Sequence, residues 1–581
     1  MNRQDILNSI RQNRQVSVLI IGAGINGIGT FRDLALQGVD VLLVDRADFC
    51  SGTSAASSHM AHGGIRYLEN GEFRLVREAV QERNRLIQNA PHIVRPLPTV
   101  MPTFKWVSGM LNAPLKFLGL LNKPTERGAA IIKMGLMMYD AYTGKEGTVP
   151  KHEFYLREEA LKHYPEINPD IVCAAKYYDG LIEAPERLCV ELVLDAEEAS
   201  AKAKALNYMS VVNAEGHTVY LKDEVTGEML EVQPKIVINA AGPWIDFANR
   251  ALGHKTRFIG GTKGSHLVLN HPQLRQAIGE HEFFFENDDG RIVLICPLLD
   301  KVLVGTSDIP IENPDEARCT DEEIDYFIGM IDNVFPNILV DRSQIVFTFS
   351  GVRPLPASDA NNPGQISRDH SIKIVEPTQE ITFPTYHLIG GKWTTFRAFG
   401  EQVSDQVLAR LGRARQSSTE NLAIGGGKAY PPDEQMTEQW YHLQQKWSRQ
   451  PHSLIENLFK RYGTRAEFVL DHMVRETKEN GTPNKAKSHD DTLIDQPNYY
   501  RQEIAFLAQS EKIVHLDDLI LRRSHLAMLG EVTAPLLNEL ADILADTLGW
   551  SLEERQNEIE RTIAILADRH RVHLEIREMS S

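Results

Sequence analysis

The chain lacks paired cysteines. Its five cysteines, Cys50, Cys173, Cys189, Cys296 and Cys319, are scattered, and no C-x-x-C pair occurs. Zinc sites and disulfide frameworks need cysteines at regular spacings, so the sequence predicts no metal site and favours a reducing compartment. Each cysteine is expected to be a small buried residue.

The chain also has no long basic run and no apolar run long enough to cross a bilayer. Its formal net charge of −17 repels polyanions, so we expect no nucleic-acid partner. A membrane-spanning helix needs about 20 apolar residues in a row, and the polar first fifteen residues differ from a signal peptide. We therefore expect a cytoplasmic protein, or one that lies peripherally on the cytoplasmic face of a membrane.

What the chain does have is the size and composition of a folded enzyme. Its 581 residues exceed what one hydrophobic core usually serves, so two or three domains are expected. Apolar residues make up 42% of the chain and charged residues 24%, which is typical of a soluble globular protein.

The first fifty residues carry the pattern of a dinucleotide site. The apolar run VSVLII (16–21) predicts a buried strand, and GAGING then places Gly22, Gly24 and Gly27 before a helical pattern. The next predicted strand, VDVLLVD, ends at Asp45. This order predicts that pyrophosphate binds at the helix N-terminus and that Asp45 bonds a ribose hydroxyl. The alternative is a plain βαβ unit whose glycines serve packing.

Three further segments favour FAD over NAD. After Asp45 the chain continues as RADFCSGTSAASSHMAHGGIRYLE, whose small and hydroxyl residues suit an extended cofactor. The run PKIVINAAGPW ends in a glycine turn at Gly242, as a strand returning to the cofactor would. Near residue 390, FPTYHLIGGKWTTFRAFG predicts a strand, two glycines, Lys392 and a helix whose N-terminus could face the electron-rich end of a reduced flavin.

These segments, with GTKGSH, GTSD, SGVRPL and ISRDH, resemble those of the FAD-dependent glycerol-3-phosphate dehydrogenases, which are related to D-amino-acid oxidase. The resemblance covers residues 16–397 in order and continues more weakly beyond them. It implies FAD as cofactor, and oxidation of sn-glycerol 3-phosphate to dihydroxyacetone phosphate by hydride transfer to flavin N5. The implied flavin contacts are Gly22, Gly24, Gly27, Asp45, Thr53, Ser54, Ser58, His62, Gly63, Gly242, Lys392, Thr394 and Thr395.

A phosphorylated polyol brings about two negative charges that need fixed cations. The candidate cations stand next to turns or strand ends, although each alone is more often a salt-bridge partner or a solvated side chain. By resemblance, Arg353 helps to stabilise the alkoxide. The same resemblance implies that phosphate binding or substrate orientation is the role of Arg66, Tyr67, Arg368 and Lys392.

His266, in KGSHLVL, is the acid/base candidate. An imidazole near its usual pKa can take the substrate hydroxyl proton as hydride leaves carbon 2. A structurally satisfied histidine, with water as the proton acceptor, is the alternative. Asp308, in VLVGTSDIP, follows a strand and a glycine, and it either belongs to the site or caps the next turn.

The expected fold class is α/β, with a Rossmann-like FAD-binding domain of the glutathione-reductase type, an antiparallel-sheet substrate domain and a helical C-terminal domain. The FAD-binding domain is predicted to be discontinuous (about 1–90, 170–250 and 350–415), with the substrate domain inserted (about 90–170 and 250–350). The glycine- and proline-rich AIGGGKAYPPDEQ reads as a linker. Helical spacing beyond it predicts a domain at 420–581 for packing or assembly.

Residues 106–142 form a basic, strongly apolar segment that is too short to span a bilayer. Such a segment can lie in the lipid interface, and a core helix hairpin is the alternative. Dehydrogenases of the family pass electrons to quinone, which is dissolved in lipid, so the resemblance favours peripheral membrane contact through this segment.

Other functions are open at this point. An oxidase would share the half-reaction and pass its electrons to oxygen, making hydrogen peroxide. A flavin amine oxidase fits less well, because several cations suit a phosphate better than a carboxylate. A non-catalytic membrane-docking or scaffold protein could keep the flavin fold, and a colourless sample that gains nothing from FAD would indicate it. A homodimer is the oligomeric state that we expect as a possibility for this chain.

Overall fold

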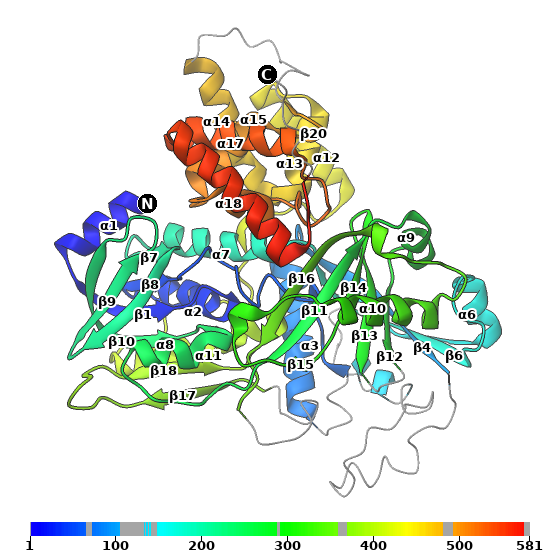
Figure 1. Cartoon of the computed structure of the whole chain (residues 1–581), viewed down its shortest axis with the longest axis horizontal. Coiled ribbons are helices and arrows are strands. Elements are labelled where there is room, and N and C mark those ends of the chain that lie inside the picture. The colour runs from blue at the N-terminus through cyan, green and yellow to red at the C-terminus, as the bar shows by residue number, and fades with distance from the viewer. Residues whose placement is uncertain are drawn as a thin grey trace, which may run out of the picture.

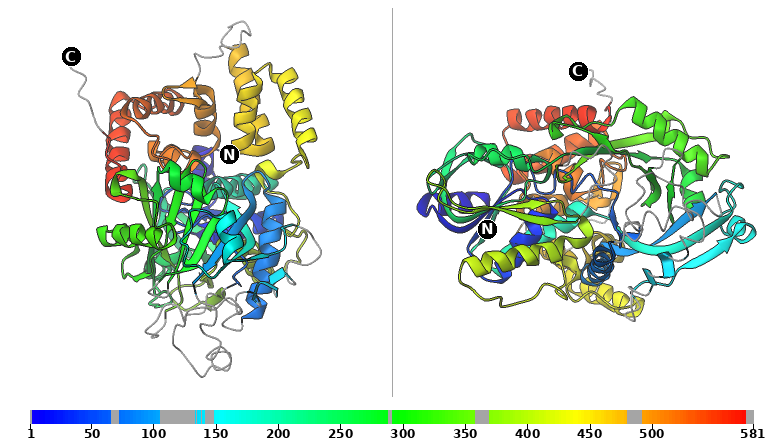
Figure 2. Two further views of the ribbon diagram at one scale, coloured as in Figure 1. Left: turned by 90° about the vertical axis from the view of Figure 1, so that its right-hand side faces the viewer. Right: turned by 90° about the horizontal axis from the view of Figure 1, so that it is seen from below.

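The computed structural model describes residues 2–65, 72–104, 148–287, 291–357, 369–479 and 492–574, with a few positions between 133 and 140. Figure 1 shows two sheets side by side beneath a layer of helices from the C-terminal part of the chain. In the side view of Figure 2 this layer again stands above the sheets. The predicted α/β class with a helical C-terminal domain is confirmed.

The first sheet has a parallel centre in which β1 pairs with β2 and β10. The antiparallel pair β8 and β9 extends from β10. Its strands, in spatial order, are β17 (Ser371–Val375), β18 (Thr385–Ile389), β10 (Met229–Asn239), β1 (Gln15–Ile21), β2 (Val41–Val44) and β7 (Ala203–Leu206), with β8 (Met209–Glu215) and β9 (Thr218–Asp223).

Helices bury both faces of this sheet. They are α1 (Arg3–Gln12), α2 (Ile25–Leu36), α7 (Pro185–Ala199), α8 (Ile245–Ala251) and α11 (Phe396–Arg410). Val18 and Ile20 of β1 pack with α2, α7 and α11, whereas Leu19 and Ile21 pack with α1 on the opposite face. Because both faces are covered, the predicted strand is apolar throughout instead of alternating.

The second sheet is mostly antiparallel. Its strands are β3 (Met60–Ala61), β4 (Val94–Thr103), β5 (Glu153–Leu156), β6 (Cys173–Ile182), β11 (Thr262–Leu269), β12 (Glu282–Glu286), β13 (Ile292–Leu298), β14 (Lys301–Gly305), β15 (Ile309–Pro310) and β16 (Ile345–Arg353). Around it lie α3 (Phe73–Asn89), α6 (Arg157–His163), α9 (Pro272–Ile278) and α10 (Asp321–Val334). Strand β11 pairs with both β14 and β16, which places His266 opposite Gly305 and Phe349.

Strands β3 and β6 belong to this second sheet, although both lie inside ranges that the sequence assigned to the cofactor domain. Strand β6 pairs with β4 from Val94 opposite Ile182 to Thr103 opposite Cys173. The chain therefore passes from one sheet to the other close to Ile182. The exact domain boundaries stay a prediction.

The C-terminal helices are α12 (Glu434–Ser448), α13 (His452–Tyr462), α14 (Ala466–Glu479), α15 (Arg501–Ser510), α16 (Leu516–Asp518), α17 (Ala534–Leu548) and α18 (Leu552–His570), with the π-helical turn η9 (Leu519–Arg523) and the short hairpin β19 (Thr492–Leu493) and β20 (Gln496–Tyr500). Their apolar core is continuous with the second sheet, because Phe347 and Leu294 pack among the helical residues. The helical layer is therefore built onto the sheets.

The glycines before α12 pack tightly, although the sequence suggested a linker there. Gly425, Gly426 and Gly427 are buried, and the Gly426 N–H donates to the Glu191 carboxylate at 3.0 Å. A Cβ at Gly426 would lie 1.9 Å from the Tyr462 carbonyl oxygen. These glycines permit close packing instead of free motion.

Among the residues that the structure describes, no helix has the length and apolar character to cross a membrane. Most of the segment 106–142, for which membrane contact is predicted, lies outside the described residues.

Candidate active site

The turn between β1 and α2 places the N-terminus of the helix at the wall of a cavity that Gly22, Gly24 and Asn26 line. Gly22 adopts a φ of +103°, which favours glycine, and a Cβ there would lie 2.7 Å from the Ala240 carbonyl oxygen. A Cβ at Gly27 would lie 1.9 Å from the Gly22 carbonyl oxygen, so the helix can approach the strand only with glycine there. Gly24 is the N-cap of α2 and provides no capping side chain. Such a helix start attracts a pyrophosphate.

Asp45, at the end of β2, holds this turn in place. Its carboxylate accepts the N–H of Ala23 at 2.6 Å and the N–H of Ala47 at 2.9 Å. Burial raises the pKa of Asp45 to about 6, although both backbone N–H groups oppose that shift. The carboxylate also lines the cavity described next, where its remaining lone pairs can accept a hydroxyl group.

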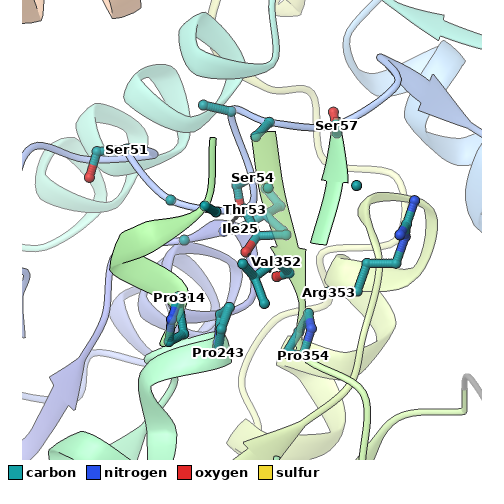
Figure 3. A pocket seen from close by; sticks show the side chains of 18 of the residues that line it. Ile25, Ser51, Thr53, Ser54, Ser57, Pro243, Pro314, Val352, Arg353 and Pro354 are labelled. Carbon is teal, nitrogen blue, oxygen red and sulfur yellow. Dashed lines mark hydrogen bonds between the residues drawn. The ribbon is translucent and has the colours of Figure 1, made fainter. Parts of the chain in front are cut away.

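One large cavity, of about 1,940 Å³, joins the two sheets and the helical layer. Ligand pockets commonly have volumes of about 300–1,000 Å³, so this cavity can hold a dinucleotide together with a small substrate. Figure 3 shows a part of it, where Ile25 and Ser54 from the first sheet's side face Val352 and Arg353 on β16.

Hydroxyl side chains from the segment after Asp45 fix this wall. Ser54 Oγ accepts the Ile25 N–H at 3.0 Å, and Thr53 Oγ1 donates to the Val352 carbonyl oxygen at 2.7 Å. The segment therefore bridges α2 and β16.

His266 lies at the far end of the cavity. Its ring stacks on Phe349 with 4.7 Å between ring centroids, and Nε2 lies 2.9 Å from Ser58 Oγ. A Cβ at Gly305 would lie 2.3 Å from the imidazole, so glycine makes room for the ring. Burial, reinforced by Arg353, lowers the pKa of His266 to about 3. The side chain is therefore a neutral base at physiological pH.

Arg353, at the end of β16, is held by the loop that follows β14. Its guanidinium donates to the Ser307 carbonyl oxygen at 3.0 Å, to Thr306 Oγ1 at 3.1 Å and to the Asp308 carboxylate at 3.1 Å. Asp308 therefore belongs to the site as a partner of Arg353. These contacts fix a cation beside His266.

The turn after β18, in the first sheet, forms another part of the cavity wall. Gly390 and Gly391 both have positive φ, and a Cβ at Gly391 would lie 2.5 Å from the Asn26 side chain. Lys392 and Thr394 line the cavity. Thr394 Oγ1 donates to the His62 carbonyl oxygen at 3.0 Å. This hydrogen bond connects the turn to residues 62–64, which we call the HGG segment.

The HGG segment rests on a buried polar group. The Gly63 N–H donates to the Asp179 carboxylate at 2.8 Å, and Tyr139 also donates to this carboxylate. Arg83 Nη1 donates to Tyr139 Oη at 2.7 Å. A Cβ at Gly63 would lie 2.1 Å from Tyr139 Oη, so the position requires glycine.

The cavity brings together most of the residues that the sequence predicted. Gly27, Gly63 and Thr395 do not line it, and their contacts shape its walls. Arg66, Tyr67 and Arg368 lie outside the described residues, so their predicted roles stay predictions. The predicted residues that line the cavity are Gly22, Gly24, Asp45, Thr53, Ser54, Ser58, His62, Gly242, His266, Asp308, Arg353, Lys392 and Thr394.

Sequence reasoning missed the contribution of the C-terminal helices, for which packing or assembly was expected. Residues of η9 and α18 reach the same cavity. The adjacent arginines in LRRSHLAMLG were the available signal of an anionic partner. They stand in an apolar segment, and buried arginines are usually paired with an anion. The C-terminal residues that line the cavity are Asp517, Leu521, Arg522, Met528, Arg561, Ile565, Arg569 and His570.

The residues present fit FAD. The start of α2 at the cavity wall and the absence of a Cβ at Gly22 and Gly24 suit a pyrophosphate. Asp45 stands where a ribose hydroxyl is expected, and the cavity continues without interruption to His266.

Comparisons with known proteins agree with this geometry. A family model described as FAD dependent oxidoreductase matches residues 17–405, and one described as the C-terminal domain of alpha-glycerophosphate oxidase matches residues 417–555. A solved structure of the glycerol-3-phosphate dehydrogenase from Bacillus halodurans complexed with FAD has the same fold, with a TM-score of 0.73, 20% identity and 98% coverage of both chains.

Curated relatives are more similar in sequence. A glycerol-3-phosphate dehydrogenase from Synechocystis sp. is 33% identical over 95% of this chain and 96% of its own length. A glycerol-3-phosphate dehydrogenase from Pseudomonas aeruginosa is 30% identical, over 88% and 92% respectively. A D-erythritol 1-phosphate dehydrogenase from Brucella abortus is 31% identical, over 78% and 85%. The chain therefore belongs to the FAD-dependent oxidoreductases, in the branch of the glycerol-3-phosphate dehydrogenases.

Proposed function

We propose that this chain oxidises sn-glycerol 3-phosphate to dihydroxyacetone phosphate with FAD as its cofactor. The observation that carries the proposal is one continuous cavity, which joins the Gly22–Asp45 end to a neutral histidine and a fixed arginine. The names of the relatives from Synechocystis and Pseudomonas aeruginosa support this substrate.

His266 is the base in this proposal. Its imidazole is neutral and can therefore accept the proton of the carbon-2 hydroxyl, although the burial that lowers its pKa to about 3 makes it a weaker base than the imidazole of usual pKa that the sequence suggested. Ser58 Oγ, 2.9 Å from Nε2, orients the ring. A water molecule as the proton acceptor remains the alternative.

Arg353 stabilises the negative charge that develops on the substrate oxygen when this proton leaves. Asp308 and the Ser307 carbonyl oxygen hold the guanidinium, so little rearrangement is needed during reaction. Bound FAD supplies the acceptor of the two electrons. Lys392, together with Arg66, Tyr67 and Arg368, is proposed to bind the phosphate or orient the substrate.

The visible spectrum of the purified protein, recorded without oxygen, tests the proposal. Addition of glycerol 3-phosphate should bleach the flavin band in a single turnover, because no acceptor is present to reoxidise the flavin, and D-erythritol 1-phosphate should bleach it more slowly. A flavin that dithionite bleaches, and glycerol 3-phosphate does not, would refute the substrate assignment. A colourless protein that gains no flavin band when FAD is added would refute the cofactor site in solution.

We further propose that the electrons pass to a membrane quinone, and that the protein lies peripherally on the cytoplasmic face of the membrane through residues 106–142. An oxidase that reduces oxygen is the second candidate, and the match to a model named for alpha-glycerophosphate oxidase favours it. After anaerobic bleaching, faster reoxidation by a soluble quinone than by air supports the dehydrogenase. Sedimentation with anionic vesicles at low salt tests the membrane contact, and protein that stays in the supernatant argues against it. The homodimer stays a prediction.

A further inference from the structure

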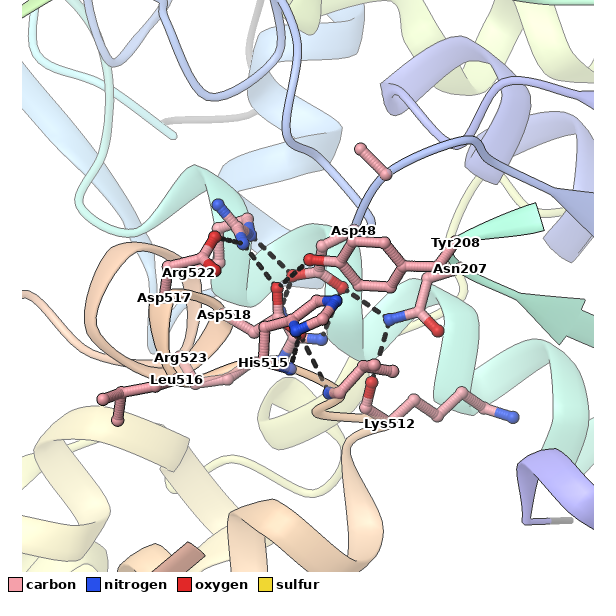
Figure 4. Close-up of polar contacts among 12 residues, drawn as sticks. Asp48, Asn207, Tyr208, Lys512, His515, Leu516, Asp517, Asp518, Arg522 and Arg523 are labelled. Atoms are coloured by element: carbon pink, nitrogen blue, oxygen red, sulfur yellow. Dashed lines mark hydrogen bonds and ion pairs between the residues drawn. The ribbon is translucent and has the colours of Figure 1, made fainter. Parts of the chain in front are cut away.

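Asp48, three residues beyond Asp45, is the centre of a buried ion cluster that joins the cofactor segment to the C-terminal helices. Its side chain is fully buried. The carboxylate accepts Arg522 Nε at 2.6 Å, two Arg523 nitrogens at 2.5 and 3.0 Å, and Asn207 Nδ2 at 2.9 Å. Figure 4 shows both guanidiniums converging on this group.

The cluster continues into the helical layer. Arg522 Nη2 also donates to Asp518 at 2.5 Å and to Asp517 at 3.0 Å. Tyr208, which follows β7, donates its hydroxyl to Asp518 at 2.5 Å. Asp48 and Arg523 come from segments that lie far apart in the sequence, so these two charges compensate each other only when the segments are together. Arg522, in contrast, also has Asp517 and Asp518 of its own segment as partners.

This cluster borders the dinucleotide end of the cavity. Asp48, Arg522 and Tyr208 line it together with Asp45 and Gly22. The segment that begins at Asp45 is therefore anchored by the pair of C-terminal arginines in addition to the glycine turn, Ile25 and Val352.

We propose that the C-terminal helical domain is part of the FAD site, and that FAD binding and docking of this domain stabilise each other through Asp48. If the arginines leave Asp48, the Asp48 carboxylate and the Arg523 guanidinium lose each other as partners, and the segment beyond Asp45 loses this anchor. Arg522 keeps Asp517 and Asp518 as partners. A ligand that requires this segment in place then binds more weakly. Thermodynamic linkage makes the effect reciprocal, so FAD must in turn favour the docked domain.

Asp48→Asn tests the coupling, because it removes the charge and preserves the shape. We expect the dissociation constant of FAD, measured by fluorescence titration of the full-length apoprotein, to rise at least tenfold. Hydrogen exchange provides a second measurement that does not depend on activity. In the wild type, FAD should slow exchange across residues 504–514, which do not line the cavity, and in Asp48→Asn this slowing should be lost.

The matched control is Glu198→Gln. Glu198 of α7 pairs with Arg465 and Lys428 from the C-terminal part of the chain, and none of the three lines the cavity. This variant should change the dissociation constant of FAD by less than twofold. If Asp48→Asn does not fold, Arg523→Lys keeps the charge but loses the two-pronged contact, and a three- to tenfold weaker binding of FAD is expected. The proposal would be overturned if the dissociation constant of FAD in the Asp48 or Arg523 variant stayed within twofold of the wild-type value. It would also be overturned if the control variant bound FAD as weakly as the Asp48 variant.

Discussion

At the scale of single residues, the site depends on groups whose chemical state is set by their neighbours. Burial keeps His266 neutral, and Asp308 together with Thr306 fixes the guanidinium of Arg353. Both the charge and the two-pronged geometry of Arg353 are used, and a lysine retains only the charge.

Arg353→Lys should therefore lower kcat/KM for glycerol 3-phosphate by about 100-fold, as the loss of one fixed donor to a developing oxyanion commonly does. Flavin content, read from the absorption spectrum after denaturation, should change by less than twofold. Arg342→Lys is the control, since this exposed arginine pairs with Asp321 and Asp325 outside the cavity. Equal losses of flavin and turnover in the Arg353 variant would instead indicate a role in folding.

At the scale of elements, close contact between β1 and α2 determines the shape of the phosphate-binding turn. The glycine pattern predicted this contact correctly, because only a residue without a Cβ lets the helix pass the Gly22 carbonyl oxygen. The HGG segment and the Gly390–Gly391 turn depend on glycine in the same way. At Gly63 and Gly391 the obstructing atoms belong to Tyr139 and Asn26, which lie in distant segments that the local pattern does not reveal.

Gly27→Ala should move α2 away from the turn. We expect a loss of about 1–3 kcal/mol in the free energy of unfolding, as for other overpacked positions, together with weaker FAD binding. Chemical denaturation and FAD titration measure the two effects. Gly329→Ala in α10 is the matched control, because nothing lies within 4 Å of its added Cβ. Alanine there should stabilise the helix by about 0.5–1 kcal/mol. A Gly27 variant as stable as the wild type would contradict the packing argument.

At the scale of the whole molecule, several histidines are buried in their neutral form. Burial lowers the pKa of His59 to about 4, of His266 to about 3 and of His387 to about 4. Below its usual pKa of about 6.5, each imidazole binds a proton more readily in the unfolded chain than in the folded one. The contribution of these neutral histidines to the free energy of unfolding is therefore fully present above pH 6.5, and it is lost as the pH falls toward 4.

We expect the free energy of unfolding to fall between pH 7 and pH 5 by about 1–2 kcal/mol for each such histidine. Urea denaturation at the two pH values measures the change. His59→Asn should reduce it, because asparagine tolerates the positive φ of 57° at this position and does not titrate. The same replacement at the exposed His217 should leave the difference intact. An unchanged pH dependence in the His59 variant would contradict the assignment.

The sequence alone determined the βαβ start and the presence of a dinucleotide site, and it supplied polar candidates that line the cavity. These follow from local rules, since strand and helix periodicity and the steric needs of glycine act over a few neighbouring residues. His266, Arg353 and Lys392 could be chosen as candidates because each stands at a strand or beside a turn.

Only the tertiary structure decided which of these residues share a cavity, and that the C-terminal helices reach it. The ion cluster around Asp48 joins residues 474 and 475 positions apart, and no local pattern encodes such a pairing. The buried glycines before α12 were taken for a linker for the same reason, because glycine permits both free motion and close packing. Which of the two occurs depends on what lies opposite, and that is settled only when the whole chain folds.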